Sequence, residues 1–419
     1  MKIELDYLTR IEGHGHLLIE RKAGKVFDCR LQVVETPRFF EAMLLGRHYR
    51  DVATIVARVC GVCSISHTIA SLTATEAALQ IEVPPQAQLL RRLLSCGEIV
   101  QSHLLQLYFM ALPDFLGAPS LFALLEEKQE LVARALRLKR TANRICEVVG
   151  GRSIHPVSTC LGGFSTRPEA GELKKLRQEL VAALPDLEAT VELFSSFEFP
   201  QFSRQREALC IAPDGVYPLS GQQLVSSAGS NYRVAEYREQ IEEYISPNST
   251  AKLARTKQGS YMVGPQARLR NGWKQLSPMA AKVCNALQVD RNGSNPFENL
   301  KARLVEVIHY TEAALHTIDE LLLCGINKLV GTVNPVFGGQ GTAAIEAPRG
   351  LLFHSYQFDE KGLLTHADCV IPTAQNLATI EQDFKQLLPI LLDQPEEQIR
   401  QQLEMLVRAY DPCLSCSTH

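Results

Sequence analysis

Four cysteines, arranged as two Cys-x-x-Cys pairs, are the residues of this sequence best suited to chemistry. Cys60 and Cys63 form the first pair, in the segment Arg-Val-Cys-Gly-Val-Cys. Cys413 and Cys416 form the second pair, in Asp-Pro-Cys-Leu-Ser-Cys close to the C-terminus. Each pair places two sulfurs on the same side of one tight turn, and a helix N-terminus beside them would favour thiolates. Together the two pairs predict a tetrathiolate site for one soft metal ion.

The spacing of the cysteines does not identify the metal. Zinc is the more common occupant of such sites, but its two pairs usually lie ~15–20 residues apart. Here the pairs lie about 350 residues apart. A thioredoxin-like redox pair would need a βαβ pattern around one motif, which is missing. The other eight cysteines stand singly and predict buried, reduced thiols. Zinc and nickel both stay open on spacing alone.

Composition limits the classes of protein to consider. The chain has 419 residues, 46% of them apolar, and its 43 Lys and Arg against 46 Asp and Glu give a net charge of −3. Such a chain can bury a large core and is not disordered as a whole. The charge balance gives no reason to expect nucleic acid or an anionic membrane as a partner. Because no apolar run approaches ~18 residues and no secretory signal is visible, we expect no membrane span and a cytoplasmic location.

Hydrophobic periodicity predicts the elements that must position these cysteines. Strand-like runs come first, at 3–5, 16–20 and 26–34. Helical spacing follows, over 89–105, 121–149, 172–194, 300–323, 375–392 and 396–410. An irregular segment covers 200–296, and a hairpin is predicted with arms 344–358 and 363–371 around a turn at 359–362. Since no repeat or linker interrupts the chain, we predict one domain, 1–419, with a predominantly helical α+β fold.

Six short motifs occur in a fixed order along the whole chain. They are Arg-Ile-Glu-Gly-His at 10–14, the first cysteine segment at 58–67, Gly-Gly-Arg-Ser-Ile-His-Pro at 150–156, Glu-Ala-Pro-Arg-Gly at 346–350, Ile-Pro-Thr-Ala-Gln-Asn at 371–376 and the closing segment at 411–419. Together they resemble the catalytic large subunit of nickel–iron hydrogenases. The closing segment and Pro-Arg-Phe-Phe-Glu at 37–41 resemble most the cytoplasmic, multimeric branch, whose members couple hydrogen to NAD(P) or another soluble carrier. The related subunit of respiratory complex I lacks the metal cysteines.

The resemblance implies a fold, a metal centre and a reaction. The fold is that of the hydrogenase large subunit, with a central bundle of long helices and small peripheral β-sheets. Cys60 and Cys413 match terminal nickel ligands, while Cys63 and Cys416 match bridges to an iron that carries one carbon monoxide and two cyanides. Heterolytic cleavage of dihydrogen needs a Lewis-acidic metal and an adjacent base. By resemblance the base is Cys413, and Glu12 is the first carboxyl group that relays the proton outward.

Further residues around the centre follow from the same resemblance. Arg349, preceded by Pro348, matches the arginine over the open metal position, where its fork of donors suits a cyanide. The segment of Pro372 and Thr373 matches the part that binds the other cyanide. Two carboxylates, Asp114 and Asp411, match those that flank the arginine. His67 matches an imidazole that donates to a bridging sulfur.

The resemblance also implies a structural cation near the C-terminus. Glu41, the backbone carbonyl of Cys369 and the imidazole of His419 match its three protein ligands, usually around magnesium. A cysteine at position 369 departs from the family pattern, but only its main-chain oxygen is needed. Family precursors commonly carry an extension that a protease removes after the matching histidine once nickel is inserted, so we expect a maturation protease and nickel-insertion factors as partners.

The remaining sequence implies that electrons leave through other subunits. After the four site cysteines, no cysteine-rich run remains that could hold an iron–sulfur cluster. No glycine-rich dinucleotide fingerprint follows a strand. We therefore expect an iron–sulfur small subunit and further diaphorase subunits that bind flavin or NAD(P). Two alternatives are kept: a hydrogen-sensing subunit, and a non-catalytic subunit with a structural zinc tetrathiolate.

Overall fold

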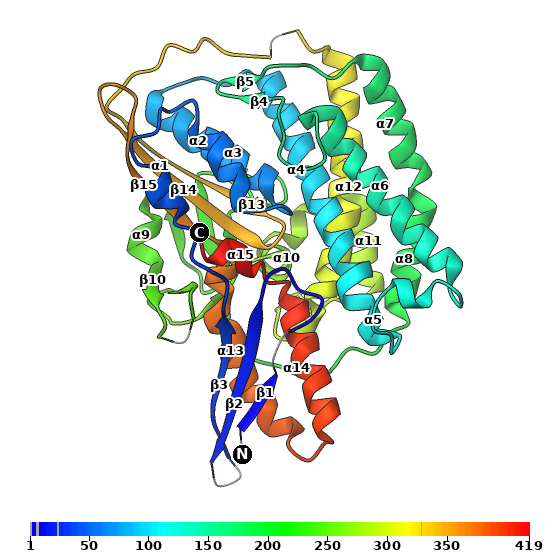
Figure 1. The fold of residues 1–419 in the computed structure, drawn as a ribbon. Coiled ribbons are helices and arrows are strands. Elements are labelled where there is room, and N and C mark those ends of the chain that lie inside the picture. The colour runs from blue at the N-terminus through cyan, green and yellow to red at the C-terminus, as the bar shows by residue number, and fades with distance from the viewer. Residues whose placement is uncertain (1, 6–7, 23–24, 248, 328) are drawn as a thin grey trace.

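Long helices form one layer of the fold, on the side away from strands β14 and β15 (Figure 1). The computed structural model describes residues 2–5, 8–22, 25–247, 249–327 and 329–419. Helix α4 (Pro85–Leu105) packs along both α6 (Gln129–Gly150) and α12 (Asn299–Cys324). Leu90, Leu94 and Leu104 of α4 recur at helical spacing and are buried, so the apolar stripe of the helix faces this bundle.

The other helices cover the bundle or hold the two ends of the chain. They are α1 (Phe40–Leu44), α2 (Val52–Val56), α3 (Ser64–Leu79), α5 (Leu112–Phe115), α7 (Ala170–Ala182), α8 (Leu184–Ser195), α9 (Tyr237–Gln240), α10 (Pro265–Gly272), α11 (Pro278–Ala286), α13 (Pro372–Leu391), α14 (Glu396–Tyr410) and α15 (Leu414–Ser417). A π-helical turn, Gln106–Ala111, continues α4.

Small sheets lie around the helices. The strands are β1 (Lys2–Leu5), β2 (Gly15–Lys22), β3 (Lys25–Val33), β4 (Thr159–Cys160), β5 (Gly163–Phe164), β6 (Glu207–Ile211), β7 (Ser220–Gly221), β8 (Gln223–Ser226), β9 (Asn231–Arg233), β10 (Glu242–Ile245), β11 (Lys252–Arg255), β12 (Tyr261–Met262), β13 (Gln340–Ala347), β14 (Gly350–Phe358) and β15 (Leu364–Val370). Two sheets have four strands, in the orders β15-β14-β13-β7 and β12-β6-β8-β9, and β1, β2 and β3 form a third.

The sheet of β13 and β14 supports the first cysteine pair. Helix α3 follows directly after Cys63 and packs across β13 and β14 (Figure 1). These two strands pair in antiparallel register, with Ala347 opposite Gly350, so only Pro348 and Arg349 form the turn. The turn therefore brings an arginine to the end of the sheet at which α3 begins.

The C-terminal segment meets the segments on either side of β2 and β3 inside the molecule. The segment before β2 runs beside the segment before α15, where Glu12 and Cys413 form a parallel β-bridge. The amide of Arg38, after β3, donates to the carbonyl of Thr418 over 2.8 Å. The C-terminal segment is consequently buried between the N-terminal strands, α3 and α13, and its end lies near the centre of Figure 1.

The predicted α+β class with a central long-helix bundle is confirmed, but several elements differ from the sequence analysis. The segment 172–194 is two helices, α7 and α8, because Pro185 lacks an N–H and begins a new helix. The segment 121–149 starts as a short 3₁₀ turn, and α6 begins only at Gln129. The predicted hairpin arm 344–358 is two strands, β13 and β14, with Arg349 in the turn between them.

A bilayer crossing needs a long helix that is apolar throughout. Among the described residues no helix meets that requirement.

Candidate metal centre

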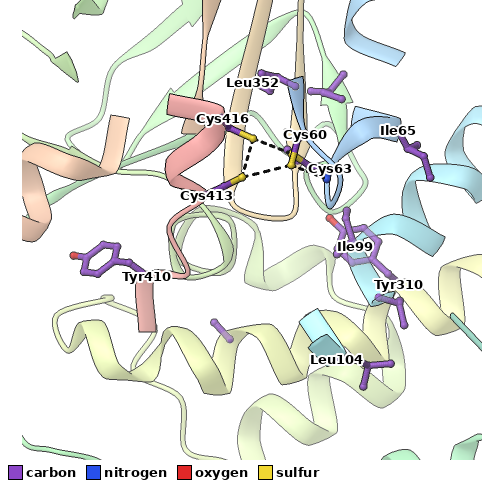
Figure 2. Close-up of a cluster of buried hydrophobic side chains, with 14 of the residues drawn as sticks. Cys60, Cys63, Ile65, Ile99, Leu104, Tyr310, Leu352, Tyr410, Cys413 and Cys416 are labelled. Carbon is purple, nitrogen blue, oxygen red and sulfur yellow. Dashed lines mark hydrogen bonds between the residues drawn. The ribbon is translucent and has the colours of Figure 1, made fainter. Parts of the chain in front are cut away.

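The four cysteines predicted to share a metal ion lie together in the core. Figure 2 shows their sulfurs pointing toward one another, with Cys60 and Cys63 on one side and Cys413 and Cys416 on the other. The Sγ atoms of Cys60 and Cys413 are 3.4 Å apart, and those of Cys63 and Cys416 are 3.6 Å apart. All four sulfurs lie within 4.8 Å of one another, and all four residues are buried. This is the arrangement that one soft metal site requires.

Local hydrogen bonds hold the first pair in a tight turn. The amides of Val62 and Cys63 both donate to Cys60 Sγ, over 3.2 and 3.3 Å. Glu98 of α4, which is 1% exposed, then accepts from the amides of Ile65 and Ser66 over 2.7 and 2.9 Å. These amides belong to the first turn of α3 and have no acceptor within the helix. A buried carboxyl group, whose pKa burial raises to about 8, thus fixes the start of α3 directly after Cys63.

Protonation of the sulfurs is unequal when no metal is bound. Hydrogen bonds from Cys413, Cys416 and Cys63 and the charge of Arg349 hold the pKa of Cys60 well below its usual range, although burial opposes this. Burial raises the pKa of Cys413 and of Cys416 well above the usual value. A cation that replaces the shared protons would let all four groups ionise, because metal binding requires thiolates.

Arg349 lies against the second pair through Asp411. Its Nε donates to the Asp411 carbonyl over 2.7 Å, and its Nη2 donates to Asp411 Oδ1 over 3.0 Å. The charges of Asp411 and the cysteines outweigh burial and raise the pKa of Arg349, so the guanidinium stays charged. Nη1 of Arg349 is buried and has no hydrogen-bond partner among the residues that the structure describes. A buried charged donor without a partner is costly, which indicates a missing acceptor at this point.

Asp114 has two arginine partners in the structure, Arg408 and Arg10, and its predicted place beside Arg349 stays a prediction. Its two oxygens accept from Arg408, over 2.7 Å to Nε and 2.9 Å to Nη2, and Oδ1 also accepts from Arg10. Arg303, which sequence reasoning missed, has its Nη1 3.4 Å from Asp411 Oδ2. The position of an aspartate in the sequence does not determine which of several arginines its carboxylate will contact in the fold.

A small enclosed cavity of about 10 Å³ adjoins the sulfurs. Its lining consists of Cys63, His67, Ala347, Arg349, Leu352, Ile371, Pro372, Thr373, Cys413 and Cys416. Thr373 Oγ1 accepts from the amide of Cys413 over 2.9 Å, which leaves its hydroxyl hydrogen free to donate. Because proline has no N–H, any backbone donor here is the amide of Thr373, in the first turn of α13. Donors on both sides of the sulfurs fit a metal group that carries small acceptor ligands.

His67 lines the same cavity and is neutral. Burial lowers its pKa to about 4, so the imidazole carries no charge at neutral pH. Its Nδ1 lies 3.1 Å from Nε2 of His354, a buried residue of β14. The other ring nitrogen, Nε2, is therefore the one available to the sulfurs, as the predicted role of His67 needs.

Glu12 is held by the segment between the two C-terminal cysteines. Leu414 donates its amide to the Glu12 carbonyl over 3.0 Å. The amide of Ser415 donates to Glu12 Oε2 over 3.1 Å, and its hydroxyl donates to Oε1. Ser415 is a site residue that the sequence analysis missed, although it stands inside the motif that was used. These contacts keep the Glu12 carboxylate beside the backbone of Cys413.

The three predicted ligands of a structural cation also lie together. Nε2 of His419 is 2.9 Å from the carbonyl oxygen of Cys369 and 3.6 Å from Glu41 Oε1. Burial opposes ionisation of Glu41, but contacts with His419, Lys252 and the Cys369 amide outweigh it and lower its pKa to about 2. Nearby, Oε1 of Glu243 is buried without a partner. Two carboxylates, a carbonyl and an imidazole are a donor set that fits a small divalent cation and its waters.

Comparison with known proteins agrees with this geometry. Residues 38–130 and 226–419 match the family described as Nickel-dependent hydrogenase, and residues 2–36 match a family described as HoxL-like. The chain belongs to the nickel-dependent hydrogenase family. It is 33% identical to sulfhydrogenase 1 subunit alpha of Pyrococcus furiosus, with 100% of this chain and 98% of that one covered. Identity to sulfhydrogenase 2 subunit alpha of the same organism is 34%, over 100% and 99% of the two chains.

A solved structure extends the family likeness to the fold. The NAD+-reducing [NiFe]-hydrogenase in the H2-reduced state superposes with a TM-score of 0.90 at 29% identity, covering 100% of this chain and 99% of that chain. Both the predicted family and the predicted large-subunit fold are confirmed. The chain is the catalytic large subunit of a nickel–iron hydrogenase, an oxidoreductase.

Proposed function

We propose that this hydrogenase subunit cleaves dihydrogen reversibly and heterolytically, into protons and electrons. One observation carries the proposal: four buried sulfurs from two distant segments lie beside an arginine with an unpaired, buried N–H. When bound, a nickel–iron group would supply the Lewis-acidic site that polarises dihydrogen. One carbon monoxide and two cyanides on iron are the proposed small ligands, because they would supply acceptors for Arg349 and for the Thr373 segment.

The chain's own residues would hold the metals and move the proton. All four thiolates would hold the nickel–iron group, Cys60 and Cys413 as ligands of nickel and Cys63 and Cys416 as ligands of both metals. Cys413 Sγ is proposed as the first proton acceptor. Glu12, held by Ser415 against the backbone of Cys413, would take the proton from it and pass it outward. His67 would donate to a bridging sulfur, and Asp411 would keep Arg349 in place.

Metal analysis combined with infrared spectroscopy tests the function directly. The purified native complex is expected to contain nickel and iron and to show absorption bands of metal-bound carbon monoxide and cyanide. Zinc in place of nickel, with no such bands, would instead support a structural tetrathiolate. Bands with slow turnover and a signalling partner would favour a hydrogen sensor.

Arg349→Lys is expected to lower turnover about a hundredfold or more while the metal centre still assembles. Lysine keeps the positive charge but lacks the planar fork, so it cannot bond Asp411 twice and also present a third donor to the cavity. The measurement is hydrogen uptake, together with nickel and iron content and the infrared bands. Turnover close to that of the wild type would show that Arg349 does not act on the metal group.

Magnesium is proposed as the cation held by Glu41, the Cys369 carbonyl and His419. Glu41→Gln should lower magnesium content and lower Tm by about 2–5 °C, since binding to the folded state alone adds stability. A chelator should have the same effect on the wild type. Cys369→Ser is the matched control, because it removes the thiol but keeps the carbonyl oxygen, so its magnesium content should not fall. Equal magnesium in Glu41→Gln and the wild type would contradict the site.

An iron–sulfur small subunit is the proposed electron partner. The first cysteine pair lies close to the surface, since Arg58 and Gly61 are exposed on either side of Cys60. The loop after α6 adds Ile154 and Val157, which are 44% and 55% exposed, and its His155 amide donates to Ser64 over 2.8 Å. An apolar and basic surface beside the centre suits a protein partner that carries clusters.

Electron transfer beyond that partner is also a proposal. Diaphorase subunits that bind flavin or NAD(P) are supported by the likeness to an NAD+-reducing hydrogenase and two sulfhydrogenase alpha subunits. A maturation protease, nickel-insertion factors, a single domain over 1–419 and a cytoplasmic location stay predictions. Purification of the native complex and identification of its co-eluting subunits would test the partners.

A further inference from the structure

Arg268, a completely buried residue of α10, donates hydrogen bonds to the backbone just before Arg349. Its exposed fraction is 0%. Its Nη1 donates to the Ala347 carbonyl over 2.9 Å, and its Nη2 donates to the Pro348 carbonyl over 3.1 Å. These are the two peptide groups that lead into the turn between β13 and β14. One guanidinium therefore restrains the turn from which the Arg349 side chain extends.

Buried carboxylates fix the orientation of Arg268 itself. Its Nε and Nη2 donate to the two oxygens of Glu306 over 2.7 and 2.6 Å, and its Nη1 donates to Glu346 over 2.9 Å. Glu306 lies on α12, so the pair ties the turn to the long-helix bundle. A planar fork of this kind leaves the guanidinium little freedom to rotate.

Glu306 in turn has every oxygen site occupied. Besides Arg268, it accepts from the Tyr217 hydroxyl over 2.8 Å and from His103 Nε2 over 2.8 Å. Nη1 of Arg303 lies 3.5 Å from His103 Nδ1, and because arginine can only donate, the His103 hydrogen must be on Nε2. Buried charges hold a defined geometry when their partners are complete, as here.

The backbone around Arg349 leaves no room for the turn to move toward α10. Gly264, which precedes α10, has φ +109°, and a Cβ there would lie 2.8 Å from the Arg349 carbonyl oxygen. Gly350 has φ +132°, and a Cβ there would lie 2.7 Å from the Gly264 nitrogen. Such close contact between two peptide segments needs glycine at both positions. The start of α10, the turn and Arg268 consequently form one packed unit.

We propose that Arg268 is a positioning residue for Arg349, which holds the β13–β14 turn so that the unpaired Nη1 of Arg349 stays at the cavity beside the sulfurs. Asp411 restrains the side chain of Arg349 by accepting its hydrogen bonds. Arg268, which Glu306 holds in place, restrains the backbone that leads to Arg349. The inference rests on the proposed function of the metal centre and names a residue that acts on it only through Arg349.

A double-mutant cycle between positions 268 and 349 tests this role in the native complex. Arg268→Lys, which loses the fork, should lower hydrogen-uptake turnover roughly tenfold to a hundredfold, as misplaced catalytic groups do. Nickel and iron content should persist, while the infrared bands of iron-bound cyanide should shift or split. In an Arg349→Lys background, the same change at 268 should lower turnover by less than about twofold. The proposal would be overturned if the losses of turnover in the two single variants multiply in the double variant. It would also be overturned if Arg268→Lys leaves the cyanide bands unchanged.

Arg91→Lys is the matched control. Arg91 forms a similar buried fork with Glu76, with two distances of 2.6 Å, and also donates to the Cys160 carbonyl over 3.2 Å. It should lower thermal stability as Arg268→Lys does, but leave the cyanide bands in place. A band shift in both variants would mean that any lost buried fork disturbs the centre, and would refute a special role for Arg268.

Tyr217→Phe provides a milder variant if Arg268→Lys does not fold. It removes one donor from Glu306 and leaves the fork to Arg268 intact. Tyr217→Phe should shift the cyanide bands in the same direction as Arg268→Lys, but by a smaller amount. Its effect on turnover should vanish in the Arg349→Lys background. An effect that persists in that background would overturn the proposal. Wild-type protein without carbonyl or cyanide bands would refute the proposed function itself, whereas bands with an additive cycle would refute only the role of Arg268.

Discussion

Cys416→Ser is expected to yield folded protein that lacks the nickel–iron centre and has no measurable hydrogenase activity. A serine hydroxyl is a poor ligand for a soft metal and is not ionised at neutral pH. The sulfur of Cys416 lies 2.8 Å from that of Cys413 and 3.6 Å from that of Cys63, so its loss removes a contact to each pair. Cys60→Ser should have the same outcome. Metal analysis and infrared bands are the measurements.

Cys284→Ser serves as the control for these replacements. Cys284 lies on α11, is 2% exposed and is not among the four cysteines that share a metal site. Its replacement changes a buried thiol in the same way without touching the centre, so nickel content should stay at the wild-type level. Full nickel content and normal activity in Cys416→Ser would refute the metal assignment.

Glu12→Gln is expected to abolish hydrogen uptake and deuterium–proton exchange together, while metal content stays normal. Glutamine can reproduce the contacts seen here, because its oxygen can accept from the Ser415 amide and its NH₂ can donate to the Ser415 hydroxyl. The variant should therefore assemble the centre, but an amide cannot exchange a proton at neutral pH. Both activities are measured on the purified complex.

Two further variants sharpen the test of Glu12. Glu12→Asp shortens the side chain by one methylene and should retain part of the activity if a water fills the gap. Ser415→Ala removes one of the two bonds from Ser415 to the carboxylate and should lower activity only in part. If exchange continues at the normal rate in Glu12→Gln, with unchanged metal content, the proton leaves by another group.

Spacing alone was sufficient to predict that each Cys-x-x-Cys pair binds a metal ion from one tight turn. The resemblance of the ordered motifs was needed to predict which distant segments meet. The two cysteine pairs, Glu12 beside the closing segment and the cluster of Glu41, Cys369 and His419 lie together as that resemblance implied. The long helices were also visible, because their apolar stripes repeat over many turns.

Contacts that depend on tertiary pairing could not be predicted in this way. Apolar residues continue across 344–358, so periodicity favoured one strand, although Pro348 and Gly350 mark the turn at which Arg349 lies. The pairing of Asp114 with Arg408 and Arg10 was not predicted, because the sequence does not show which arginines a carboxylate will contact. The roles of Glu98 and Arg268 were only weakly indicated by the sequence. The one indication was a charged residue at a position that helical spacing places in the core.

The separation of 353 residues between each cysteine and its opposite partner has a consequence for biosynthesis. A growing chain carries Cys60 and Cys63 as a vicinal dithiol for most of its translation, before the residues that complete the site exist. During that interval two thiols can be oxidised to a disulfide or capture zinc, but they cannot make a four-thiolate cage. The metal centre can therefore be filled correctly only after the closing segment has been synthesised. The order of the segments along the chain thus requires a reducing environment and a late delivery of nickel.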